Sequence, residues 1–154
     1  MAPIHVLLVD DEQSFAEVLA QRLLNRGLKV TPVFNGPDAL DRIEEDGTLD
    51  VLILDVAMPA MDGLETLQEI RKRRPLLETI MLTGRATLHS AVEAMKSGAF
   101  DYLMKPCDLE ELLSKVKRAA ERKRGREKQI LEIRMKPYVS EREKEELTAR
   151  ILAS

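Results

Sequence analysis

A chain of 154 residues, 44% of them hydrophobic, is long enough to bury the core of one domain with an appendage, which argues against disorder of the whole chain. Its single cysteine, Cys107, excludes an intrachain disulfide and the small secreted folds that such bonds hold together, so a cytoplasmic location is expected. The first apolar run ends at two aspartates after about six residues, so we expect neither a signal peptide nor a membrane span.

The net charge of −3 is unevenly distributed. Residues 1–108 contain 11 Lys and Arg against 18 Asp and Glu, whereas residues 109–136 contain 10 against 5. The acidic and basic parts of the chain are therefore expected to have different roles.

Five short apolar segments, rich in β-branched residues, have the length and composition of β-strands. They are residues 4–9, 28–33, 51–55, 79–83 and 102–104. The segments between them have apolar residues at helical spacing. Strict alternation of apolar strands with one-sided helices predicts an α/β fold, namely a doubly wound five-stranded parallel sheet with right-handed crossovers.

The last part of the chain is predicted to be helical. Asp108 is a candidate N-cap for a helix that runs past Arg124, although Gly125 weakens its middle by roughly 1 kcal/mol. Pro137 ends this pattern, and Ser140 with Glu143 forms a capping box that opens a last short helix.

Three carboxylates are expected to meet at one edge of the sheet. Asp10 and Asp11 follow the first strand and Asp55 ends the third, and the carboxyl ends of parallel strands lie at the same edge. Three clustered anions repel one another unless a cation lies between them. Mg²⁺ prefers oxygen ligands and keeps several waters, so it suits this small ligand set.

The same edge carries the groups that phosphoryl transfer needs. A carboxylate such as Asp55 can attack phosphorus and form an aspartyl phosphate. Lys105, at the end of the fifth strand, supplies a cation, and Thr83, at the end of the fourth, supplies a hydroxyl donor for phosphoryl oxygens.

The motifs LLVDDE, LILDVAMPAMDG, MLTG and GAFDYLMKP, in this order, resemble the response-regulator receiver domain of two-component signal transduction. The resemblance covers about residues 4–120 and implies a CheY-like, flavodoxin-like (βα)₅ fold. It also implies a sensor histidine kinase or phosphotransfer protein as the phosphodonor. We therefore expect a receiver domain over residues 1–122 and a helical C-terminal extension over residues 123–154.

The resemblance also implies roles for individual residues. Asp55 is the phosphoacceptor, and the metal is held by Asp11 directly, by Asp10 largely through water, by Asp55 and by the backbone carbonyl of Ala57. Lys105 binds the phosphoryl group.

A switch pair is implied as well. The hydroxyl of Thr83 moves toward the phosphoryl group, and the ring of Tyr102 turns inward behind it. A cis peptide bond is expected at Lys105–Pro106, because X–Pro bonds adopt this form at low cost.

Positions around the site are expected to tune it. Ala57 leaves access for a hydrolytic water, and Arg85 is placed to shield or pair with the phosphate. Other loop positions are interpreted as loop shape and helix start: Met58, Pro59, Met61, Asp62 and Gly63.

Three functions remain open. The first is a stand-alone receiver that catalyses only its own phosphorylation and dephosphorylation, and that controls a partner protein or its own dimerisation. The second is nucleic-acid binding through the basic run 115–128, which has 8 Lys and Arg against 2 Glu, although a solvated helix face is the commoner meaning of such a run. The third, a phosphohydrolase, would usually have a second aspartate where Ala57 stands.

Lys123 and Arg126 also interrupt an apolar heptad, which weakens the case for a coiled-coil dimer.

Overall fold

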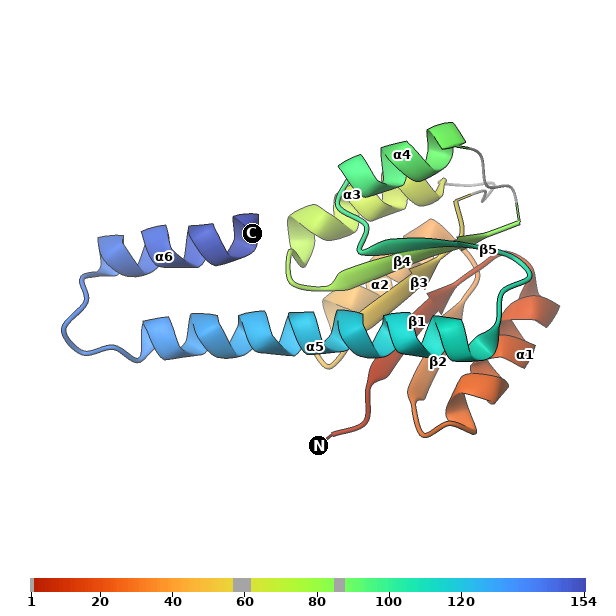
Figure 1. Cartoon of the computed structure of the whole chain (residues 1–154), viewed down its shortest axis with the longest axis horizontal. Coiled ribbons are helices and arrows are strands. Elements are labelled where there is room, and N and C mark those ends of the chain that lie inside the picture. The colour runs from red at the N-terminus through yellow and green to blue at the C-terminus, as the bar shows by residue number, and fades with distance from the viewer. Residues whose placement is uncertain (1, 57–61, 85–87) are drawn as a thin grey trace.

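The computed structural model describes residues 2–56, 62–84 and 88–154, which form a layered α/β domain with a helical hairpin at one end (Figure 1). The elements in chain order are β1 (His5–Val9), α1 (Gln13–Leu24), β2 (Lys29–Val33), α2 (Gly36–Glu45), β3 (Val51–Leu54), α3 (Gly63–Arg73), β4 (Glu78–Thr83), α4 (Leu88–Lys96), β5 (Asp101–Met104), α5 (Leu109–Arg134) and α6 (Glu141–Ala153).

The strands form one parallel sheet in the order β2-β1-β3-β4-β5. This confirms the predicted fold class, with each predicted strand shifted by one residue at an end. The main surprise is Glu78, which begins β4 although a charged residue is a poor strand signal. It is buried there, and an arginine from α5 pairs with it.

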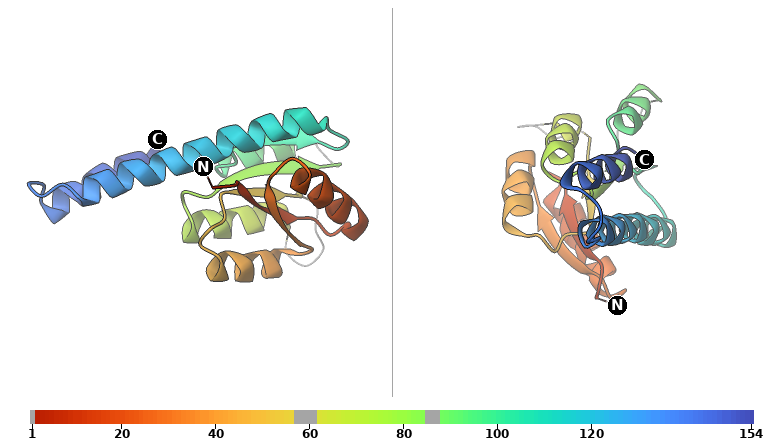
Figure 2. Two further views of the ribbon diagram at one scale, coloured as in Figure 1. Left: turned by 90° about the horizontal axis from the view of Figure 1, so that it is seen from below. Right: turned by 90° about the vertical axis from the view of Figure 1, so that its left-hand side faces the viewer.

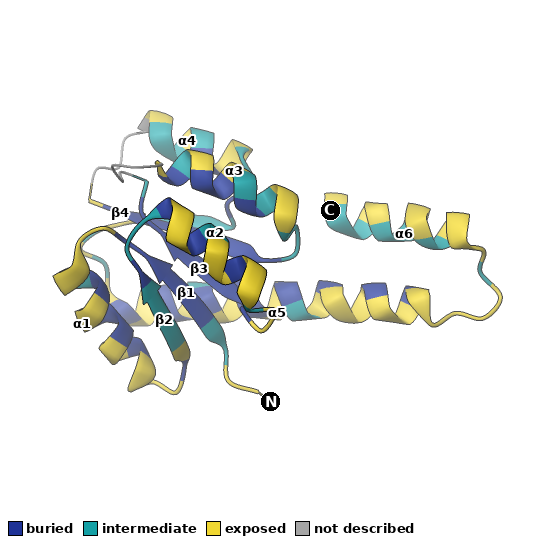
Figure 3. Ribbon diagram, turned by 180° about the vertical axis from the view of Figure 1, so that it is seen from behind, coloured by how far each residue is buried: buried dark blue, intermediate teal, exposed yellow. Residues whose placement is uncertain are grey.

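Two hydrophobic cores cover the two faces of the sheet, because successive strand residues point to opposite sides. On β1, Val6 and Leu8 pack with α1 and α5, whereas Leu7 and Val9 pack with α2, α3 and α4. The three central strands β1, β3 and β4 are accordingly almost continuously buried, whereas the edge strands β2 and β5 are mostly half-buried (Figure 3), as expected for a parallel sheet with helices on both faces.

Helix α5 is a continuous helix of 26 residues that extends beyond the sheet. Gly125 does not interrupt it, and nothing lies within 4 Å of where a Cβ would stand. The domain boundary predicted after residue 122 falls inside this helix and stays a prediction.

Helix α6 folds back alongside α5 and packs against it (Figures 1 and 2). The predicted cap is confirmed, since the Ser140 hydroxyl accepts a hydrogen bond from the backbone N–H of Glu143 at 3.1 Å. At the start of α5, Asp108 occupies the N-cap position without a side-chain capping bond.

The interpretation of the basic run as a solvated helix face is wrong for two of its members. Lys123 and Arg126 are only 8% and 6% exposed. Lys123 Nζ lies 3.2 Å from Asp50 Oδ1, and Arg126 Nη1 lies 3.2 Å from Glu78 Oε1. Both carboxylates lie at the amino edge of the sheet, so these cations attach the extension of α5 to the base of the domain.

Candidate functional site

Four side chains predicted to form the site lie at the carboxyl ends of strands. Asp10 and Asp55 directly follow β1 and β3, Thr83 is the last residue of β4, and Lys105 directly follows β5. Backbone hydrogen bonds hold them there: the N–H of Asp55 donates to Val9 at 3.0 Å, and that of Lys105 donates to Thr83 at 2.9 Å. The strand ladder thus extends into the site and fixes its positions.

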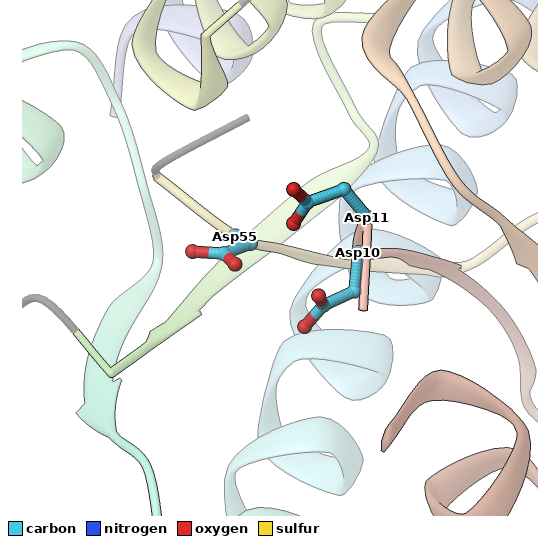
Figure 4. A group of neighbouring side chains, drawn as sticks. All are labelled: Asp10, Asp11 and Asp55. Carbon is cyan, nitrogen blue, oxygen red and sulfur yellow. The ribbon is translucent and has the colours of Figure 1, made fainter. Parts of the chain in front are cut away.

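The three predicted carboxylates form one cluster (Figure 4). One oxygen each from Asp10, Asp11 and Asp55 lies within 4.8 Å of the others. Asp10 and Asp55 are buried, at 2% and 4% exposure, whereas Asp11 is exposed. In an octahedral Mg²⁺ shell, neighbouring oxygens are about 2.9 Å apart and opposite ones about 4.2 Å apart, so small side-chain rotations would fit this cluster to the ion. The cluster can therefore hold a metal ion.

Lys105 is the cation at the centre of the site. Its Nζ lies 2.6 Å from Asp10 Oδ2 and 3.5 Å from Asp55 Oδ2. Two further contacts were not anticipated from the sequence: Glu12 Oε1 at 3.1 Å, and the ring of Phe15, whose centroid lies 4.1 Å below the ammonium group. Phe15 falls at an apolar helical position, so its pattern indicates only core packing. The aromatic face and the carboxylates together hold the Lys105 ammonium group beside the carboxylate of Asp55.

Burial and charge act against each other in this cluster. Burial raises the pKa of Asp10, and this outweighs the opposing hydrogen bond from Lys105. Burial alone would lower the pKa of Lys105, but the hydrogen bond and charge of Asp10 outweigh it and raise that pKa. Lys105 is therefore fully charged at neutral pH, which suits a group that receives an anion.

The two residues of the predicted switch pair lie on neighbouring strands. Thr83 is fully buried at the end of β4, and Tyr102 is half-buried on β5. The Tyr102 hydroxyl lies 3.0 Å from Ser90 Oγ on α4, a contact absent from the sequence expectations. No motif marks Ser90, because only the packing of α4 on β5 brings it to the tyrosine.

The start of α3 lies directly against the end of β3. Asp62 caps the helix by accepting a hydrogen bond from the N–H of Glu65 at 2.8 Å, as expected of a helix start. The N–H of Gly63 donates to the carbonyl of Val56 at 2.8 Å. A Cβ on Gly63 would lie only 2.1 Å from the backbone oxygen of Asp55, so the absence of a side chain is required here.

Several predicted residues lie outside the described part of the chain. These are Ala57, whose carbonyl was expected at the metal, Arg85, and the loop residues Met58, Pro59 and Met61. The predicted cis bond at Lys105–Pro106 is confirmed. None of the helices in the described ranges is long and apolar enough to cross a membrane.

Comparisons with known proteins agree with this geometry. Residues 6–117 match the family described as the response regulator receiver domain. The chain is 43% identical over 114 residues to the DNA-binding transcriptional regulator NtrC of Escherichia coli K12, which covers 74% of this chain and 24% of NtrC. It is 40% identical over 121 residues to the uncharacterized transcriptional regulatory protein YkoG of Bacillus subtilis, which covers 79% of this chain and 52% of YkoG. The chain thus spans about a quarter and about half of these two relatives.

Solved structures of similar proteins share the fold. A CheY-like receiver domain protein from Methanospirillum hungatei superposes with a TM-score of 0.76 at 30% identity, over 80% of this chain and 98% of that one. The receiver domain of NtrX from Brucella abortus superposes with a TM-score of 0.71 at 31% identity, over 75% and 98%. The family match covers well over half of the chain, and the sheet order and acidic edge agree with it: the chain belongs to the response regulator receiver family.

Proposed function

We propose that the chain is a phosphorylation switch in which Asp55 accepts a phosphoryl group with the help of Mg²⁺. One observation carries the proposal: Lys105 Nζ lies within 3.5 Å of Asp55 Oδ2 and within 2.6 Å of Asp10 Oδ2, at an edge where three carboxylates cluster. Carboxylates for a hard cation, a nucleophile and a fixed ammonium group are the parts that phosphoryl transfer to aspartate requires.

In the proposed reaction a carboxylate oxygen of Asp55 attacks the phosphorus of a phosphohistidine on a histidine kinase or phosphotransfer protein. The new O–P bond forms as the N–P bond breaks, and the histidine nitrogen leaves with the bonding pair. Lys105 neutralises charge on the transferred oxygens, and the Thr83 hydroxyl donates to one of them. Asp10, Asp11, Asp55 and the carbonyl of Ala57 would hold the Mg²⁺ ion, which when bound would supply further positive charge to these oxygens.

The phosphoryl group then favours a second arrangement of Thr83 and Tyr102. The phosphoryl group shifts the populations of the two arrangements only to the extent that it interacts more favourably with one than with the other. The chain would catalyse its own phosphorylation and dephosphorylation only, and its output would be binding to a partner protein or to a second copy. Nucleic-acid binding through the basic run is disfavoured, because Lys115, Lys123, Arg124 and Arg126 are engaged in ion pairs within the chain.

Intact mass spectrometry after incubation with acetyl phosphate and Mg²⁺ tests the proposal. The wild-type chain should gain one phosphoryl group, and Asp55→Asn should gain none, because an amide oxygen is a poor nucleophile. Asp62→Asn is the matched control: it makes the same chemical change near the site, keeps the cap of α3 and should label normally. Equal labelling of Asp55→Asn and the wild type would overturn the assignment. Chromatography of the same samples distinguishes self-association from a partner-directed output.

A further inference from the structure

A cavity of about 610 Å³ lies at the opposite end of the domain from the carboxylate cluster. It lies between the amino edge of the sheet and the hairpin of α5 and α6. The base of the domain contributes Ile43, Leu49 and Leu77, and the hairpin contributes Ile130, Leu131 and Leu152. Both walls are thus largely aliphatic, and the proposed phosphorylation chemistry uses none of these residues.

The lining carries an excess of positive charge, with five Lys and Arg against two Asp and Glu. Part of this charge is neutralised inside the chain: Lys123 Nζ lies 2.6 Å from Glu127, and Arg73 pairs with Glu44 at 3.2 Å. The other three cationic side chains make no ion pair with any residue in the described ranges. They are Arg74, Lys128 and Arg134.

These three cations approach the cavity from both walls. Arg74 is the C-cap residue that follows α3, and its Nη2 donates to the carbonyl of Ile43 at 2.6 Å. Lys128 and Arg134 belong to α5. An anion in the cavity would therefore meet positive charge from the domain and from the hairpin at once.

The hairpin wall is held in place by Arg126. Its Nη2 donates to the carbonyls of Ile151 at 2.6 Å and Leu152 at 2.8 Å, the last turn of α6, while its Nη1 reaches Glu78. The last carbonyls of a helix lack partners in the helical ladder, and here Arg126 adds to the hydrogen bond that the Ser154 hydroxyl donates to Ile151 at 2.8 Å. This arrangement fixes α6 against the base of the domain and makes the cavity a preformed feature.

We infer that this cavity binds a small amphiphilic anion, a molecule with an apolar body and one carboxylate, sulfonate or phosphate group. The volume lies within the roughly 300–1,000 Å³ typical of small-molecule sites, and aliphatic walls with a few charged groups are typical of such sites. The apolar body would lie between the aliphatic walls, with the head group near Arg74, Lys128 and Arg134. The ligand would be a dissolved monomer rather than a membrane lipid, because the cavity lies between the hairpin and the domain base and not on a protruding face.

Titration of the full chain with dodecanoate below its micelle concentration, followed by calorimetry, tests this inference. One saturable site is expected, with binding at least tenfold weaker for uncharged dodecanol. The double variant Lys128→Gln with Arg134→Gln should also weaken dodecanoate binding about tenfold, because both positions are exposed on α5 and the change removes head-group partners.

The matched control is Arg118→Gln with Lys136→Gln, which removes the same charge from exposed positions outside the cavity and should bind as the wild type does. Thr148→Trp, which fills the cavity from the α6 side, should abolish binding while leaving the helical circular dichroism unchanged. No saturable binding, equal binding of dodecanol, or equal losses in both double variants would overturn the inference.

Two further arms separate the alternatives. The chain can instead be tested for co-flotation with vesicles that contain anionic phospholipid. Co-flotation without binding of monomeric dodecanoate would show that Arg74, Lys128 and Arg134 bind a membrane surface, and would overturn the inferred site for a dissolved ligand. Asp55→Asn should bind dodecanoate normally, so failure of the phosphorylation proposal and failure of this one are distinguishable.

Discussion

Gly63, the first residue of α3, lies directly against the backbone at the end of β3. The position where its Cβ would stand is 2.1 Å from the carbonyl oxygen of Asp55 and 2.6 Å from the Cα of Val56. Both neighbours are backbone atoms, which cannot turn away as the end of a side chain can. The sequence indicated a turn and a helix start here, but the contact with Asp55 depends on the folded arrangement.

Gly63→Ala is therefore expected to lower the free energy of unfolding by about 2 kcal/mol or more and to reduce labelling of Asp55, because the backbone of β3 must move. Urea denaturation and acetyl phosphate labelling measure the two effects. Gly125→Ala is the comparison: its Cβ meets nothing within 4 Å inside a helix, so it should stabilise the chain by about 1 kcal/mol. Unchanged stability and labelling of Gly63→Ala would contradict the close approach.

Lys105 shows how far residue roles follow from sequence. Its place after β5 predicted the cation, and the structure brings it to the carboxylates of Asp10 and Asp55. Its contact with Phe15 was not predicted, because an aromatic residue at an apolar helical position has the same pattern whether or not a cation lies over its ring.

At the scale of elements, α5 is the part of the fold that sequence described least well. Its start and its length beyond Arg124 were predicted, but its buried cations were interpreted as exposed or as breaks in a heptad. The reason is physical: a buried arginine or lysine requires a carboxylate partner, and the partners Asp50 and Glu78 are 48 or more positions away along the chain. A single sequence does not reveal such a pairing.

Arg126→Gln, which removes the buried pair with Glu78, should lower the stability of the chain. Glu78 is 2% exposed, and its other cationic partner, Arg122 Nε, lies 3.7 Å away on the partly exposed side of α5. Removing Arg126 therefore leaves the buried carboxylate only partly compensated, and the free energy of unfolding should fall by roughly 2 kcal/mol. Hydrogen exchange of α6 should rise, because the carbonyls of Ile151 and Leu152 lose the hydrogen bonds that join them to α5.

The control for this change is Arg118→Gln on the exposed side of α5, which should alter neither property. Adding Glu78→Gln to Arg126→Gln should recover part of the lost stability, because it removes the buried charge that Arg122 alone compensates only in part. Protection of α6 that is identical in Arg126→Gln and the wild type would show that the arginine does not hold the hairpin.

At the scale of the molecule, Asp50 joins three distant parts of the chain. It accepts hydrogen bonds from the N–H of His5 in β1, from Lys123 and from Arg124. Arg124 also donates to the carbonyls of Ala2 and Pro3. The N-terminal segment, the sheet and the C-terminal extension therefore meet at one carboxylate.

This junction predicts a dependence of stability on pH. Burial raises the pKa of Asp50, but the hydrogen bonds and charges of Arg124 and Lys123 outweigh it and bring that pKa below its ordinary value of 3.8. A lowered folded-state pKa contributes stability that is present above about pH 4 and is lost as the pH falls through the folded-state pKa. Urea unfolding of the wild type between pH 5 and 3 should show this loss.

Asp50→Asn should be less stable than the wild type at pH 5, and the gap should narrow at lower pH. The difference in unfolding free energy between the two proteins is the quantity to follow. The raised pKa of Asp10 changes stability with pH in the opposite direction, but it does so equally in both proteins and cancels in the difference. A gap that stays constant down to pH 3 would rule out titration of Asp50 as the cause.

The length of α5 has one more consequence. Leu109 begins the helix four positions after Lys105, so its first turn is tied to the edge where the phosphoryl group is proposed to arrive. The 26 residues make a rod about 39 Å long, and Lys123 and Arg126 fasten it to Asp50 and Glu78 at the opposite edge of the sheet. The helix is therefore a strut that joins the edge of the carboxylate cluster to the base of the domain, and its two buried ion pairs resist any tilt about its first turn.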